Sequence, residues 1–121
     1  VYAAHPSTEV MVLAYAVDDE PVRAVDLTDD RIAGSEVRFW NELTRGHDVV
    51  AHNAAFDRTI MRHAFPVCVP LLERWRCTMA QAYAHSLPGA LDALGAVLGV
   101  EQDKRKLKEG RDLVHLFCKP R

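Results

Sequence analysis

The stretch Asp48-Val-Val-Ala-His-Asn-Ala-Ala-Phe-Asp-Arg-Thr-Ile-Met61 decides the fold class of this 121-residue chain. Residues 48–52 form a short apolar run typical of a strand, and residues 54–64 follow with helical character. Asn53 stands between the two and is a candidate N-cap. Asp57 falls in the first turn of the predicted helix. The pattern therefore predicts a carboxylate near the C-terminal end of a strand, where α/β folds gather their sites.

The rest of the chain predicts further elements of both kinds. Residues 10–17 are apolar on both faces and predict a central strand that is covered on both sides. Residues 21–28 predict a second strand, antiparallel to the first. Helices are expected over 36–45, over 78–85, from 86–88 onward and over 111–118, with a short extended segment at 73–77. This order predicts an α/β architecture in one domain, 1–121, with a mixed sheet between helices.

Composition and charge exclude several classes of protein. Apolar residues make up 49% and charged residues 26%, which is ordinary for a globular domain and excludes disorder and collagen. The net charge of −2 does not indicate nucleic-acid binding through bulk charge, although a local basic strip stays open. The three cysteines lack C-x-x-C spacing and indicate reduced thiols in a cytoplasmic protein. No membrane partner is expected, because the run at 10–17 is far shorter than the ~20 residues of a membrane helix.

The series Asn53-x-x-Phe56-Asp57 after a short apolar strand resembles the second motif of the DEDD, or DnaQ-like, 3′–5′ exonucleases. Further stretches look like the same exonuclease domain in phage and prophage family A DNA polymerases, in matching order over nearly the whole chain. They are Tyr2-Ala3, residues 5–10 and 14–16, Asp18-Asp19, Pro21-Val22, Cys77-Thr78-Met79, residues 87–91, Asp103-Lys104-x-Lys106, Gly110-Arg111-x-Leu113 and residues 117–120. The resemblance implies an incomplete ribonuclease H-like fold and a proofreading 3′–5′ exonuclease.

The resemblance also implies a mechanism and roles for particular residues. In the family, four carboxylates hold two ions, Mg²⁺ or Mn²⁺, which hydrolyse the 3′-terminal phosphodiester. Asp57 would be the second-motif carboxylate, both catalytic and metal-binding. Asn53 and Phe56 would shape the channel for the 3′ end of single-stranded DNA, with His52 as their neighbour. The implied partners are that DNA strand and the polymerase domain of the same parent chain.

The sequence departs from the family's pattern at both ends. The first motif, Asp-x-Glu, is expected upstream of Tyr2. Asp18-x-Glu20 has the same letters, but Pro21 follows at once, which predicts an exposed hairpin turn instead. The third motif, Tyr-x-x-x-Asp or His-x-x-x-x-Asp, does not occur downstream of Asp57 and is expected beyond Arg121. The sequence thus predicts that this chain contains one of the family's four metal-binding carboxylates, and it leaves open whether the isolated chain is active.

Other interpretations remain open from the residues alone. A first-turn acid such as Asp57 also meets the helix dipole favourably without any further role. Lys104 and Lys106 belong to the densest basic cluster, which would contact DNA phosphates or form a solvated loop. Trp40 and Trp75 would stack on bases or pack in the interior, and the helical spacing around Trp40 favours packing. The alternative functions are a free-standing DnaQ-like exonuclease and a non-catalytic ribonuclease H-like binding or scaffold module.

Overall fold

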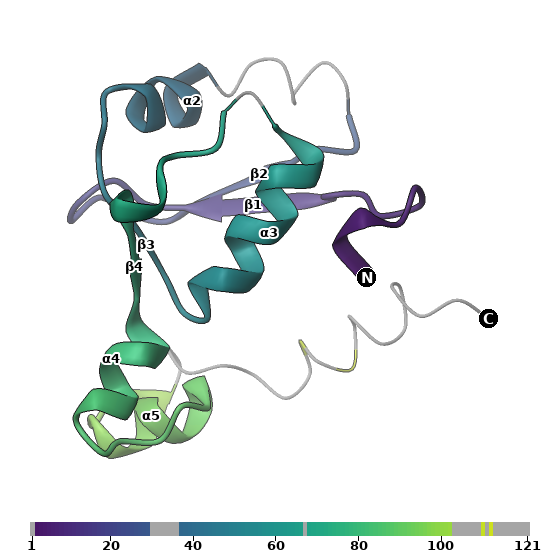
Figure 1. Ribbon diagram of the computed structural model, residues 1–121. Helices are drawn as coiled ribbons and strands as arrows, with labels where there is room; N and C mark the ends of the chain where they lie inside the picture. Colours follow the sequence, from purple (N-terminus) through teal and green to yellow (C-terminus); the bar gives the residue numbers. More distant parts are fainter. Residues whose placement is uncertain (1, 30–36, 67, 103–109, 111, 113–121) are drawn as a thin grey trace. The chain divides into compact units, whose positions relative to one another are not determined.

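The structure is a computed structural model that describes residues 2–29, 37–66, 68–102, 110 and 112 (Figure 1). The chain divides into two compact units, Val1–Cys77 and Thr78–Arg121. The first unit contains the 3-10 turns η1 (Tyr2–Ala4) and η2 (Leu72–Arg74), strands β1 (Val12–Tyr15), β2 (Arg23–Asp26), β3 (Val49–Ala51) and β4 (Trp75–Cys77), and helices α2 (Val37–Thr44) and α3 (Ala54–Ala64). The second unit contains helices α4 (Thr78–Ala84) and α5 (Leu91–Val97).

The strands of the described residues form two small ladders. β1 and β2 pair antiparallel, with Val12 opposite Asp26. β3 and β4 pair parallel, with Ala51 opposite Cys77. Parallel strands need a long crossover, and the chain between β3 and β4 supplies it as α3. The predicted α/β class is confirmed, as small sheets flanked by helices that are compatible with an incomplete ribonuclease H-like fold.

The prediction of a central β1 covered on both sides is wrong for the described residues. Along β1 exposed and half-buried side chains alternate, and Val12 is 62% exposed. Within the part of the chain that the structure describes, β1 pairs with β2 alone. A run of β-branched and apolar residues favours an extended backbone, but it does not fix how many strands lie beside it. The two ladders likewise replace the one continuous sheet that the element order suggested.

A row of four aromatic rings ties the elements of the first unit together. Tyr15 of β1 lies 4.9 Å from Phe39 of α2, measured between ring centroids. Phe39 lies 4.8 Å from Trp40, and Trp40 lies 4.9 Å from Phe65 at the end of α3. Tilted and edge-on rings at this spacing stabilise a core beyond their buried area. Trp40 is therefore half-buried and packs against Phe39 and Phe65, as its helical spacing indicated.

Helix boundaries follow the sequence signals closely, with one exception. The helix at 54–64 is confirmed, and α2 ends before Gly46, whose φ of +82° suits glycine. The helix expected from residues 86–88 instead begins at Leu91. Ser86 takes a φ of +59°, and the amide of Leu87 donates to the carbonyl of Ala82. These groups close α4, so the next helix starts later. The helix predicted over 111–118 lies outside the described residues.

Candidate functional site

The junction between β3 and α3 turns on the backbone of Asn53. This residue has φ 61° and ψ 47°, the left-handed conformation. Asparagine adopts this region more readily than most residues do. The amide of Phe56 donates to the Asn53 carbonyl at 2.9 Å, which closes the first turn of the helix. Asn53 occupies the predicted N-cap position, but its side chain makes no capping hydrogen bond.

The first turn of α3, which follows this junction, has a buried side and an exposed side. Ala54 is buried at 4% exposure, while Phe56, two residues later, is 53% exposed. Asp57 follows in the first turn of α3 and is also exposed. An aromatic face and a carboxylate thus stand next to each other at the C-terminal end of a parallel strand, the position where α/β folds place ligands.

The protein disfavours the charged form of Asp57. Desolvation by the surrounding protein raises the pKa of the Asp57 carboxyl, and the hydrogen bond from its own backbone amide opposes this to a smaller extent. The group is exposed enough to meet a ligand and yet partly stripped of water. A carboxyl group whose pKa is raised by desolvation at a strand end is a candidate for a functional site.

The structure brings four of the six predicted site residues together along one segment. His52 is half-buried and immediately follows β3, Asn53 forms the turn, and Phe56 and Asp57 lie on the first turn of α3. Lys104 and Lys106, the remaining two, lie outside the described residues.

The sequence Asp18-x-Glu20 lies in the turn between β1 and β2, as predicted. Asp18, Asp19 and Glu20 are exposed, and Asp18 has a φ of +49°. An Oε1 of Glu20 accepts a hydrogen bond from Nη2 of Arg38 on α2 at 2.6 Å. That hydrogen bond lowers the pKa of the Glu20 carboxyl. Glu20 therefore links the hairpin turn to α2, which is a structural contact.

Asp57 suits one oxygen-ligand position of a Mg²⁺ or Mn²⁺ site, because these hard ions prefer carboxylate and water oxygens. Among the described residues, no group of three or more His, Cys, Asp or Glu side chains could hold a metal ion. The described donor set therefore fits one ligand of such a site and not a complete one.

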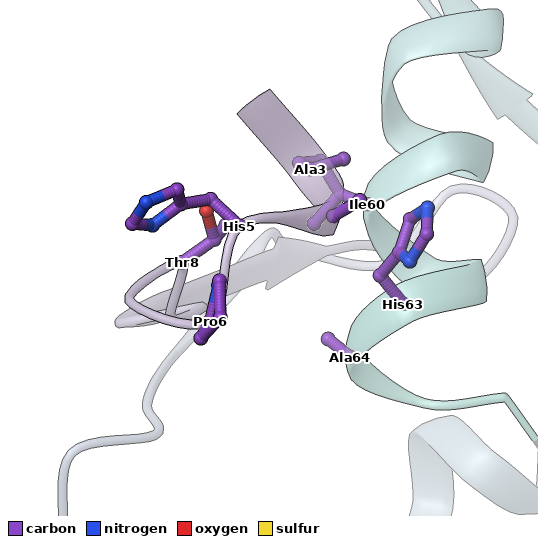
Figure 2. Close-up of a pocket in the computed structure, with 8 residues that line it drawn as sticks. Ala3, His5, Pro6, Thr8, Ile60, His63 and Ala64 are labelled. Carbon is purple, nitrogen blue, oxygen red and sulfur yellow. The ribbon is translucent and has the colours of Figure 1, made fainter. Parts of the chain in front are cut away.

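A small cavity beside α3 had no counterpart in the sequence patterns. It measures about 220 Å³ and lies between the loop that follows η1 and the C-terminal half of α3 (Figure 2). His5, Pro6 and Thr8 line it from the loop, and Ile60, His63 and Ala64 line it from the helix. The two segments are far apart in the sequence, so no local spacing pattern could have linked them.

Comparison with known proteins shows that the chain is similar to part of a DNA polymerase. It is 35% identical, over 98% of its length, to a protein described as DNA polymerase from Bacillus phage SP02. The aligned region makes up 18% of that relative, so the chain spans under a fifth of its length. No family model and no solved structure matches the chain. None of the helices in the described ranges combines the length and apolar character needed to cross a bilayer. The chain is thus similar in sequence to one region of a phage DNA polymerase.

Proposed function

We propose that residues 1–121 are part of a metal-dependent 3′–5′ exonuclease region of a DNA polymerase. In this proposal the region removes nucleotides from the 3′ end of a single DNA strand, as proofreading requires. The observation that carries it is the β3–α3 junction, which presents Phe56 and Asp57 together at the C-terminal end of a parallel strand. The similarity to a phage DNA polymerase over 98% of the chain supports the DNA polymerase context of this proposal.

Each residue of the junction has a role in this proposal. The Asp57 carboxylate is one ligand of a Mg²⁺ or Mn²⁺ site whose other ligands lie outside the described residues. Such ions, when bound, supply an activated water and stabilise the leaving oxygen. Phe56 offers an exposed ring on which the terminal base stacks. Asn53 offers an amide that both donates and accepts hydrogen bonds, and His52 adjoins it.

The test is made on the intact protein that carries this sequence. Asp57→Asn keeps the size of the side chain but removes its charge, and shortening of a 5′-labelled single strand in Mg²⁺ should fall at least about 100-fold. Losing a metal ligand removes several kcal/mol of transition-state stabilisation, and each 1.36 kcal/mol is about tenfold in rate. Asp92→Asn is the matched control, because Asp92 is likewise an acid in the first turn of a helix, α5.

Each outcome separates the proposal from its alternatives. Unchanged shortening in Asp57→Asn would reject the metal-binding role of Asp57. Shortening without primer extension by the intact protein would favour a free-standing DnaQ-like exonuclease. DNA binding with no hydrolysis that depends on Asp57 would favour a non-catalytic ribonuclease H-like module.

A further inference from the structure

We infer that Arg74 and Arg76 are positioning residues for Asp57, because they fix the register of the two strands from which the candidate site emerges. The inference rests on the proposed function, which gives Asp57 its role. β3 and β4 are three residues long each. A two-stranded ladder of that size is marginally stable by itself, so its register needs support from other contacts. Side chains at the N-terminal end of the ladder supply that support.

Two arginines at the start of β4 hold the loop that leads into β3. Asp48 directly precedes β3, and its Oδ2 lies 3.0 Å from Nη2 of Arg76, while its Oδ1 lies 3.9 Å from Nη1 of Arg74. Nη1 of Arg74 also donates a hydrogen bond to the carbonyl of Gly46. Nη1 of Arg76 donates to the carbonyl of Glu73 at 2.8 Å, so this guanidinium bridges the two segments. The contacts of Arg74 and Arg76 with Gly46 and Asp48 form an arginine clasp.

The arginine clasp distinguishes the observed register from a shifted one. Val50 lies opposite Arg76, and both side chains belong to the exposed face of the ladder. Asp48 belongs to the same face, because side chains alternate along a strand. A shift of one residue would turn Asp48 to the half-buried face, away from both arginines. A shift of two residues would move Asp48 by about 6.6 Å along the strand and break its 3.0 Å contact with Arg76.

The exposure of the arginine clasp does not prevent this role. The side chains of Asp48 and Arg76 are 42% and 57% exposed, and an ion pair of that exposure contributes little to global stability. In a three-residue ladder, however, a small contribution is a large part of the local stability. Gly46 also lets the Arg74 guanidinium lie against the backbone, since a Cβ there would come within 2.8 Å of Nη2.

The candidate site lies at the other end of the same two strands. Ala51 ends β3 opposite Cys77, and the chain then turns at Asn53 into the first turn of α3, which carries Asp57. A strand rises about 3.3 Å per residue, so β3 spans only about 10 Å between the arginine clasp and this turn. Helix α3 also packs on both strands. The register of the ladder therefore decides where Asp57 stands relative to the end of β4.

The first test is hydrogen exchange of the intact protein that carries this sequence, followed by mass spectrometry of peptides that cover residues 49–51. Asp48→Asn and Arg76→Gln each remove one charge of the arginine clasp. In each variant these backbone amides should exchange about two- to fivefold faster, as the loss of an exposed ion pair predicts. Arg45→Gln is the matched control, because Arg45 pairs with Glu42 at 3.1 Å and lies outside the ladder.

The second test separates positioning from a merely structural contact. For shortening of a 5′-labelled single strand in Mg²⁺, both single variants should lose about two- to fivefold in kcat with an unchanged KM for DNA. The placement of Asp57 changes, whereas the exposed ring of Phe56 still meets the strand. The double variant should lose no more than either single variant, because each removes the same contact. Arg76→Lys, which keeps the charge, should stay close to wild type.

Failure of this inference is distinct from failure of the proposed function. Wild-type exchange and wild-type kcat in Asp48→Asn and Arg76→Gln would overturn the inference and leave the metal-binding role of Asp57 intact. Faster exchange with an unchanged kcat would show that the arginine clasp is structural only and would reject the positioning role. Faster exchange in a protein without Asp57-dependent hydrolysis would reject the exonuclease and keep the control of register by the two arginines.

Discussion

At the scale of single residues, the folded chain disfavours the ionised form of Asp57, the form that would bind a metal ion. Because desolvation raises its pKa in the folded chain, ionisation costs more there than in the unfolded chain. Below the unfolded-state pKa the carboxyl is protonated in both states and carries no such cost. As the pH rises through the folded-state pKa, stability is lost. A metal ion bound to the carboxylate would reverse this preference, since a nearby positive charge favours the ionised form.

Asp57→Asn should therefore melt at or above the wild-type temperature at pH 7.5, because the amide never ionises. The advantage of the variant should shrink as the pH is lowered towards 3. Thermal unfolding followed by circular dichroism across this pH range measures the difference. Asp92→Asn, by contrast, should lose only a helix-dipole contribution of about 0.3–1 kcal/mol. If Asp57→Asn melted about 4–8 °C lower than wild type, a loss of about 1 kcal/mol, Asp57 would be a structural cap and the site assignment would fail.

The motif letters alone do not separate Asp57 from Asp18-x-Glu20, but the residue that follows, Pro21, does. Both follow an apolar strand, and the second has the spacing of a metal-binding pair. Pro21 indicated the turn, and the structure adds the ion pair between Glu20 and Arg38. The two carboxyls also differ in environment: the hydrogen bond from Arg38 lowers the pKa of Glu20, whereas desolvation raises the pKa of Asp57.

At the scale of elements, the exit from β3 into α3 depends on one left-handed residue. Asn53→Gly should keep or slightly raise stability, because glycine takes a φ of 61° without a steric penalty. Asn53→Ala should cost about 1 kcal/mol, since alanine keeps the Cβ that disfavours this conformation but lacks the short polar side chain with which asparagine tolerates it. Urea unfolding of the two variants beside wild type measures the difference. No capping hydrogen bond is lost in either variant, so equal destabilisation by both would show that the Asn53 side chain, and not the backbone, holds the turn.

The elements with local signals were predictable from the sequence. Apolar spacing and the nearby Pro66 bounded α3, and Gly46 marked the end of α2. The start of α5 was not predictable in this way, because Ser86 in a left-handed conformation has no composition signal and Pro88 suggested a first turn. The prediction that Asn53 caps α3 was correct in position. Asn53 closes the helix start through its left-handed backbone, however, and not through a hydrogen bond from its side chain.

At the scale of the whole molecule, the sequence predicted the fold class but not which strands pair with one another. Strand and helix order indicates α/β, but the pairing partners of β1 depend on contacts between distant segments. The candidate site was predictable because His52, Asn53, Phe56 and Asp57 are neighbours in the sequence. The cavity was not, since its two walls are far apart in the sequence and come together only through the packing of η1 on α3.

Metal binding by the 121-residue chain tests the whole donor set at once. Two-metal catalysis needs ions about 3.5–4 Å apart, and one carboxylate cannot fix both. Because Asp57 is the candidate ligand among the described residues, titration of the metal-free chain with Mn²⁺ in a calorimeter should show no tight two-site binding. The chain should also leave single-stranded DNA intact in Mn²⁺, and Asp57→Asn should change neither result. Tight binding of two ions that Asp57→Asn abolishes would mean that residues of this chain outside the described ranges supply the missing carboxylates, and that the complete exonuclease centre lies within these 121 residues.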